Sequence, residues 1–199
     1  RQLGAGGTQI ASRVASRLKL NLVDRQILDR VSEQAGVPSG VVEAVDESPA
    51  AARQRPRGTR PEVSDLTYNQ LIQGAIHEFA RRGDALIVGR GAHLLLKDRP
   101  GLLRVKVIAA VPSRVRSLSE RLSLSPSAAE RAVRDSDKNR ADYIRRVYKA
   151  DWMDPSLYDL VINTDAIPYD TATEIICVAA QAARERSEQT AEAEAGEAE

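Results

Sequence analysis

Short apolar segments alternate with longer helical patterns along this chain, and this alternation narrows the folds that the sequence can adopt. The apolar segments lie at residues 20–23, 85–88, 104–111 and 158–164. Between them, apolar residues recur every three or four positions over 66–82, which is typical of a helix, and the long charged stretch at 126–149 is also predicted to be helical. Strands joined by helices are usually parallel and covered on both faces. The sequence therefore predicts an α/β fold with a parallel sheet flanked by helices on both faces.

A glycine-rich loop, GAGGT at residues 4–8, leads into a helical pattern in which Ile10, Val14 and Leu18 recur every four residues. Glycines let successive backbone N–H groups point into one concavity, and a helix N-terminus adds partial positive charge. No acidic residue lies in the first turn of this helix. The loop therefore predicts a phosphate-binding site, with an ordinary glycine turn as the alternative.

The loop departs from the P-loop pattern G-x-x-x-x-G-K-[ST] at two positions. When Gly6 is aligned with the second glycine of the pattern, Arg1 stands at the first glycine and Gly7 at the lysine. A second alignment instead deletes the lysine, and in both alignments Thr8 is the natural hydroxyl ligand of Mg²⁺. Arg1 or an arginine elsewhere is the candidate to supply the missing charge. The strand that normally precedes such a loop lies before residue 1, so we expect the sequence to begin inside a longer chain.

Polar residues follow the predicted strands at the places where ligands bind in sheets of this kind. Ligands of parallel α/β sheets lie outside the carboxyl ends of the strands. The polar candidates at those ends are Gly4–Thr8, Asp24, Arg90 and Asn163. The sequence thus predicts a ligand site along one edge of the sheet.

The charge of the chain is unevenly distributed. Residues 1–150 carry a net charge of +11, and residues 151–199 carry a net charge of −10. The basic part predicts anionic partners, either phosphorylated small molecules or nucleic acid. Aromatic residues make up only 4% of the chain, basic residues alternate with acidic ones, and no nucleic-acid motif is present. We therefore expect nucleotides, and not nucleic acid, as partners.

Composition also predicts the domain organisation and the compartment. We expect one domain over residues 1–186, a mobile insertion rich in Pro and Arg at 48–64, and an acidic disordered tail at 187–199. A single cysteine argues against a disulfide framework. No signal peptide or bilayer-spanning apolar run is visible. We therefore expect a cytoplasmic protein with no membrane partner.

Several segments resemble the cytidylate kinase-like family of P-loop phosphotransferases, which are relatives of bacterial CMP kinase. The segments are RQLGAGGTQIA (1–11), LNLVDRQIL (20–28), IVGRGAHLLL (87–96) and DSDKNRADYIRRVYKADWMDPSLYDLVINT (135–164). The resemblance implies a P-loop NTPase-type parallel sheet with a helical lid at about residues 126–150. It also implies ATP- and Mg²⁺-dependent phosphoryl transfer to a nucleoside monophosphate, with CMP or dCMP as the acceptor.

The resemblance further implies roles for individual residues. The ATP phosphates would lie on the loop residues Gly4, Ala5, Gly6, Gly7 and Thr8, with Mg²⁺ on Thr8. Asp24 falls where CMP kinases begin an acceptor-binding turn, and Arg90 matches the arginine that holds the acceptor phosphate. Asp137 and Arg140 match the ends of the lid motif Asp-Arg-Asn-Arg, and Arg134 matches the further lid arginine. Phosphoryl transfer uses such arginines because guanidinium groups stabilise the charge that spreads over the transferred oxygens.

Three functions are open at this point: a nucleoside monophosphate kinase, a nucleotide-binding regulatory module without catalysis, and a kinase for another small acceptor. The absent lysine favours the regulatory module. Arg25 and Gln26 favour it too, because they stand where CMP kinases have the Ser-Gly of their Asp-Ser-Gly turn. Residues 48–64 lie where the acceptor-binding segments of such kinases vary, and this favours a kinase for another small acceptor. Of the three we expect the nucleoside monophosphate kinase.

Overall fold

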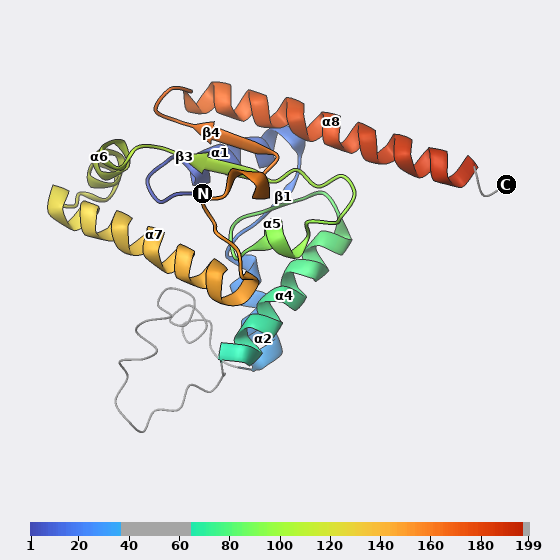
Figure 1. Cartoon of the computed structure of the whole chain (residues 1–199), viewed down its shortest axis with the longest axis horizontal. Helices are drawn as coiled ribbons and strands as arrows, with labels where there is room; N and C mark the ends of the chain where they lie inside the picture. Colours follow the sequence, from blue (N-terminus) through green and yellow to red (C-terminus); the bar gives the residue numbers. More distant parts are fainter. Residues whose placement is uncertain (37–64, 197–199) are drawn as a thin grey trace. The chain divides into compact units, whose positions relative to one another are not determined.

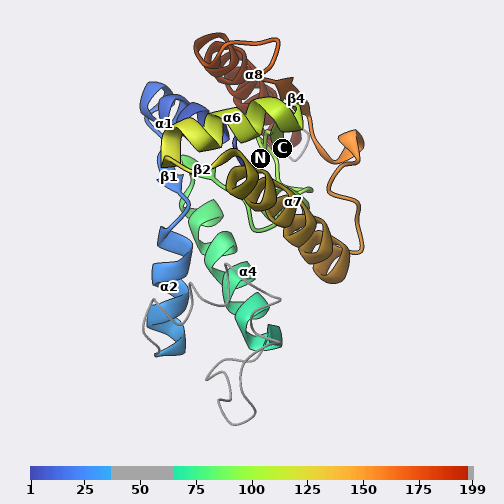
Figure 2. The same cartoon turned by 90° about the vertical axis from the view of Figure 1, so that its left-hand side faces the viewer.

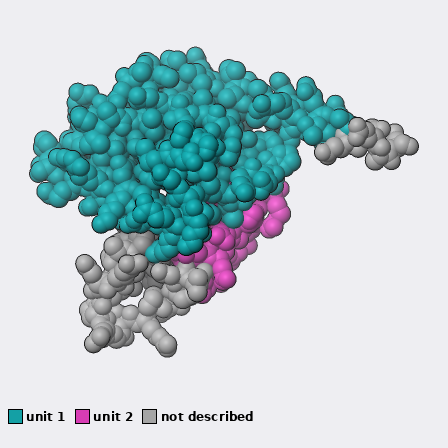
Figure 3. Space-filling model, in the orientation of Figure 1, with its two compact units in different colours: residues 1–20, 93–199 teal, residues 21–92 magenta. Residues whose placement is uncertain are grey.

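The computed structural model describes residues 1–36 and 65–196. The insertion predicted at 48–64 lies outside these residues. The chain forms two compact units, each defined by the contacts among its own residues. Unit 1 comprises residues 1–20 and 93–199, and unit 2 comprises residues 21–92 (Figure 3). Each unit contains one pair of short strands together with helices, so each can be described as a small α/β structure.

Unit 2 is built on two parallel strands and two helices. Strand β1 (Asn21–Val23) pairs with β2 (Ala85–Ile87), with Val23 opposite Ile87. Helix α2 (Gln26–Ala35) packs against α4 (Asp65–Arg82), as Figure 2 shows. Apolar side chains are buried on both helices at helical spacing: Ile27 and Val31 on α2, and Ile72, Ile76 and Phe79 on α4. The apolar periodicity of the sequence therefore sets the face that each helix buries.

Unit 1 holds the second strand pair and the remaining long helices. Strand β3 (Val105–Ile108) runs parallel to β4 (Leu160–Asn163). Helix α1 (Gly7–Leu18) packs against α8 (Tyr169–Gly196), and α6 (Val111–Leu122) packs against α7 (Pro126–Tyr148) around Leu118, Ala129 and Val133 (Figure 1). The backbone N–H of Gln2 donates to the Val107 carbonyl at 3.0 Å. Residues before the glycine loop are therefore held beside β3. Two short elements complete the order, α5 (Ala92–Leu95) and the 3₁₀ helix η2 (Pro155–Leu157).

The mixed α/β class and the parallel pairing of strands are confirmed. Over the part of the chain that the structure describes, the strands form two separate parallel pairs, β1–β2 and β3–β4, in place of the single sheet predicted. Each strand is only three or four residues long, so each ladder contains few hydrogen bonds. Within the described ranges, no helix has both the length and the apolar character needed to cross a bilayer.

Helix α8 continues to Gly196, whereas its acidic, low-complexity sequence predicts disorder from residue 187. Alanine and glutamate have high helix propensity, and they dominate this segment. Arg184 also donates to Glu188 at 3.1 Å, one helical turn further on, which stabilises a helix by a few tenths of a kcal/mol. Residues 187–196 therefore continue α8 as a polar helical extension.

A buried lysine anchors the connection between α7 and β4. Lys106 of β3 is 2% exposed, and its ammonium lies 4.6 Å from the centre of the Trp152 ring and 4.7 Å from that of Tyr158. The ammonium donates a hydrogen bond to the Trp152 carbonyl, which also accepts from the Tyr158 hydroxyl at 2.9 Å. Burial lowers the pKa of Lys106. Cation–π contacts offset part of the cost of burying this charge, so the lysine fixes the chain where it returns from α7.

His93 extends this cluster. Its ring stacks on Tyr158 with 4.8 Å between centroids. Burial lowers the pKa of His93 to about 4, with nearby positive charges such as Lys106 acting in the same direction. Burial also raises the pKa of Tyr158 to about 12. Both rings are therefore neutral at pH 7 in the folded protein.

We predict that the free energy of unfolding falls as the pH is lowered from about 6.5 to about 4. In this window the unfolded chain protonates His93, whose ordinary pKa is 6.5, but the folded chain does not. His93→Phe keeps a stacked ring and should weaken this dependence. Urea unfolding followed by Trp152 fluorescence at several pH values measures the effect. An unchanged pH dependence in His93→Phe would contradict the assignment.

Candidate functional site

The glycine loop of unit 1 is closely packed, and Gly4 and Gly6 are among the positions that leave no room for a side chain. Gly4 and Gly6 have φ angles of +84° and +77°, which favour glycine. A Cβ atom on Gly4 would lie 2.6 Å from the Arg114 carbonyl oxygen, and one on Gly6 would lie 2.2 Å from Cζ of Tyr169. The glycines therefore let the loop approach α6 and the start of α8.

The loop ends at the N-terminus of α1, where backbone donors are available. The first intrahelical hydrogen bond runs from the Ile10 N–H to the Gly6 carbonyl, so the N–H groups ahead of Ile10 have no intrahelical acceptor. Gly6 provides no side-chain cap, and the first turn contains no acidic residue. The Thr164 hydroxyl lies 3.1 Å from the Ala5 carbonyl and 3.2 Å from that of Ile108. This end of α1 is therefore fixed beside β3 and suits an anion.

A cavity of about 400 Å³ lies beside the loop. Its lining includes Gly4, Ser113, Arg116, Ser117, Asp165 and Tyr169. A hydrogen bond from the Ala110 N–H, 2.6 Å long, fixes Asp165 and lowers the pKa of its carboxyl group. The volume is in the range of small-molecule sites. Hydroxyl, guanidinium and carboxylate groups thus surround a space next to the predicted phosphate-binding loop.

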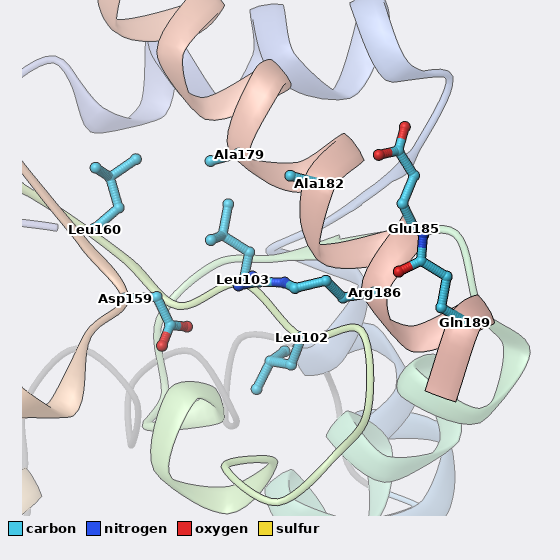
Figure 4. A pocket seen from close by; sticks show the side chains of 9 residues that line it. All are labelled: Leu102, Leu103, Asp159, Leu160, Ala179, Ala182, Glu185, Arg186 and Gln189. Carbon is cyan, nitrogen blue, oxygen red and sulfur yellow. The ribbon is translucent and has the colours of Figure 1, made fainter. Parts of the chain in front are cut away.

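A larger cavity of about 610 Å³ lies between α8 and the residues that flank β3 and β4 (Figure 4). Its apolar lining comes from Leu102, Leu103, Leu160, Ala179 and Ala182, and its charged lining residues include Asp159 and Arg186. Asp159 is already bound by Arg104, with a shortest distance of 2.6 Å. None of the residues predicted for the functional site lines this cavity, so the smaller cavity beside the loop is the better candidate.

Asp137 of α7 binds an arginine that the sequence did not predict. Arg114 of α6 donates to both carboxylate oxygens of Asp137 at 3.0 and 2.7 Å, and its side chain is 2% exposed. Its Nη1 also lies 3.5 Å from the Leu3 carbonyl. A bidentate arginine–carboxylate pair fixes both partners in one plane. Arg114 thus links Leu3, the residue just before the glycine loop, to the middle of α7.

The other predicted residues of α7 make local contacts. Arg134 donates to Glu130 at 2.7 Å on an exposed face of the helix, where its side chain is 69% exposed. Arg140 donates to the Ser136 hydroxyl at 2.6 Å. The spacing by three residues would let Asp137 orient either of these two arginines or meet a ribose or base donor, and in the structure its carboxylate pairs with Arg114. An arginine from another helix reaches Asp137 because Arg114 lies on the buried face of α6.

In unit 2 the structure brings Asp24 and Arg90 together. Asp24 follows β1, and Arg90 follows β2 between Gly89 and Gly91. The Arg90 guanidinium donates to the Asp24 backbone carbonyl at 2.9 Å and to its carboxylate at 3.3 Å. Arg90 has a φ of +53°, and both flanking glycines also have positive φ. Three successive left-handed residues make a sharp turn that returns the arginine towards the end of β1.

Arg114 was missed by sequence reasoning, although the sequence contains a signal for it. Val111, Val115 and Leu118 form an apolar stripe, and Arg114 occupies the same helical face. A charged residue on an apolar stripe needs a specific partner when it is buried. Tyr169 carries no comparable signal, because its contact with Gly6 joins residues more than 160 positions apart.

These features define a mixed α/β protein with a glycine loop that opens a helix and borders a polar cavity. Residues 1–166 match the model of the cytidylate kinase-like family, and the chain belongs to that family. The family predicted from the sequence is thus confirmed, and membership indicates a nucleotide kinase-type function.

The fold is also found in a solved structure. It is the crystal structure of an uncharacterized protein from Eubacterium ventriosum ATCC 27560, with a TM-score of 0.70 and 21% sequence identity. The similarity covers 91% of this chain and 94% of that one. No curated protein matches the chain.

We predict that loss of Asp137 destabilises the protein more than loss of Arg114. Asp137→Ala leaves a buried guanidinium without its carboxylate, which should cost about 3 kcal/mol. Arg114→Met leaves a carboxylate that is 27% exposed and can be hydrated, so its cost should be smaller. Arg134→Ala removes an exposed ion pair and should cost less than about 0.5 kcal/mol. Urea unfolding measures all three. Equal, small losses in Asp137→Ala and Arg134→Ala would show that the buried pair is not important for stability.

Proposed function

We propose that the protein is a P-loop phosphotransferase that moves the γ-phosphoryl group of ATP to a nucleoside monophosphate, CMP or dCMP, with Mg²⁺. The observation that carries this proposal is the polar cavity of about 400 Å³ that borders Gly4 of the glycine loop. Its position allows a nucleotide to lie in the cavity while its phosphates reach the N-terminus of α1. Membership of the cytidylate kinase-like family supports the same class of reaction.

The loop residues fit a polyphosphate. Gly4 and Gly6 bring the backbone close to its neighbours, and the first turn of α1 offers N–H donors without competing acidic side chains. We assign Gly4, Ala5, Gly6, Gly7 and Thr8 to the phosphates of ATP. Bound ATP would supply the phosphoryl group, and the chain's own part is to hold and orient it.

Thr8 fits a role in holding Mg²⁺. Its side chain is exposed in the first turn of α1, and its hydroxyl accepts a hydrogen bond from Arg1, which leaves a lone pair for a metal. Over the described ranges, no group of three or more His, Cys, Asp or Glu residues is arranged as a metal site. Mg²⁺ is commonly held by one or two protein groups together with phosphate oxygens and water. One hydroxyl from the loop is therefore a sufficient protein ligand in this proposal.

Asp24 and Arg90 would recognise the acceptor. A guanidinium matches a phosphate by two parallel hydrogen bonds, and Arg90 is held by the carbonyl and carboxylate of Asp24. We assign the acceptor phosphate to Arg90 and the orientation of that arginine to Asp24. Helix α7 would act as the lid, with Arg134 and Arg140 on the transferred group. Asp137 would position the lid through Arg114.

A nucleotide-binding module without catalysis is the second candidate. The observation that favours it is Gly7, which stands where a P-loop lysine would reach the β- and γ-phosphates. Such a module would use the same loop and cavity and would release its nucleotide unchanged.

We predict turnover in a coupled assay with ATP, Mg²⁺ and each common nucleoside monophosphate, with the highest kcat/KM for CMP or dCMP. Calorimetry with ATP on the same preparation separates the two candidates. Binding with turnover supports the kinase, and tight binding without turnover supports the module. The absence of turnover with every acceptor would rule out the proposed reaction.

We predict that Arg90→Ala raises the KM for the acceptor by about 10- to 100-fold, because it removes charge-assisted hydrogen bonds to the acceptor phosphate. The KM for ATP should change little. Arg82→Ala is a matched control, because Arg82 is an arginine of unit 2 with an exposed ion pair to Glu78. Steady-state kinetics with both substrates varied tests this, and equal effects of the two variants on the acceptor KM would remove the assignment.

A further inference from the structure

We propose that Arg1 takes the place of the missing P-loop lysine and binds the terminal phosphates of ATP. This inference rests on the proposed function of the glycine loop and names the residue that supplies its side-chain charge. It concerns unit 1 only, because Arg1, Gly7 and Thr8 all belong to that unit.

The first observation is the reason for a glycine at position 7. Gly4 and Gly6 have positive φ angles, but Gly7 does not. Its backbone conformation therefore permits any residue, and the requirement for glycine is one of space. A Cβ atom on Gly7 would lie 2.7 Å from Cβ of Arg1, 3.1 Å from its Cδ and 3.3 Å from its Cγ. The aliphatic part of Arg1 thus occupies the position where a lysine side chain at residue 7 would begin.

The second observation is where the charged end of Arg1 lies. Its Nε donates to the Thr8 hydroxyl at 3.2 Å, so the guanidinium reaches the first turn of α1. The backbone donors at this end of the helix lie beside the same hydroxyl. A lysine at position 7 and an arginine at position 1 would therefore deliver positive charge to the same end of α1.

Other cations of unit 1, among them Arg114 and Arg116, also lie near the loop. Arg114 is neutralised by Asp137, Arg134 by Glu130, and Lys106 lies buried against Trp152. The side chain of Arg1 contacts two residues of the loop itself, Gly7 and Thr8. A guanidinium also stays charged at every pH of interest and can bind two phosphate oxygens at once. Arg1 thus has both the position and the chemistry that the lysine would have supplied.

The test moves the positive side chain from residue 1 to residue 7. Arg1→Ala should weaken ATP binding by tenfold or more in calorimetry and should leave AMP binding within twofold of wild type, because AMP lacks the terminal phosphates. Gly7→Lys alone should also weaken ATP binding, since its side chain displaces Arg1. The double variant Arg1→Ala/Gly7→Lys should recover most of the lost affinity. Arg17→Ala, which removes an exposed arginine near the other end of α1, is the matched control and should bind ATP like wild type.

Thermal unfolding followed by Trp152 fluorescence confirms that each variant is folded. Equal ATP affinity in Arg1→Ala and wild type would overturn the inference, as would equal losses for ATP and AMP. If the double variant is folded and does not recover ATP affinity, the proposed exchange of residues 1 and 7 is contradicted. If the double variant is not folded, Arg1→Lys provides the second measurement, because it should retain part of the ATP affinity. Wild-type protein that binds ATP but transfers no phosphate would refute the proposed reaction and leave the role of Arg1 to be judged by binding alone.

Discussion

The close packing of the glycine loop is the constraint on which unit 1 depends. Gly4 lies against the backbone of Arg114, Gly6 against the ring of Tyr169, and Gly7 against the side chain of Arg1. These neighbours come from α6, from the start of α8 and from the segment beside β3. A side chain at any of the three glycines would separate the loop from one of them. The small residues thus allow three elements to meet at the N-terminus of α1, which is where the candidate phosphate site lies.

Polar contacts hold the same loop from its other sides. Thr164 links Ala5 to the end of β3, and Arg114 links Leu3 to Asp137 of α7. Buried polar groups of this kind are costly unless they are paired, so these contacts stabilise the loop in the arrangement observed. They also join the loop to α7 through a single buried arginine. Under the proposed function, this connection lets the helix that acts as the lid respond to changes in the loop.

Local pattern predicts the elements well and the contacts between them poorly. The long charged stretch that starts at Pro126 predicts a helix at 126–149, and α7 runs from Pro126 to Tyr148. The strand predicted at 104–111 is shorter, because Ala110 caps α6 and its N–H is bound by Asp165. Asp24 and Arg90 meet because parallel strands end at the same edge. Local spacing cannot show that Asp137 pairs with Arg114 and not with its helical neighbours, because that choice depends on how α6 and α7 pack.

The loop illustrates why a missing motif residue is weak evidence against a function. A phosphate responds to the position of a positive charge and to the donors around it, and not to the place in the sequence from which that charge comes. Here the loop has glycines at residues 4, 6 and 7 and retains the helix N-terminus, and the arginine six residues before Gly7 fills the space over it. A loop that had simply lost its lysine would leave that space open, and residue 7 could then carry a side chain at no steric cost. Gly7 and Arg1 are therefore best understood as one feature, because residue 7 has no side chain and the side chain of Arg1 occupies the space that such a side chain would fill.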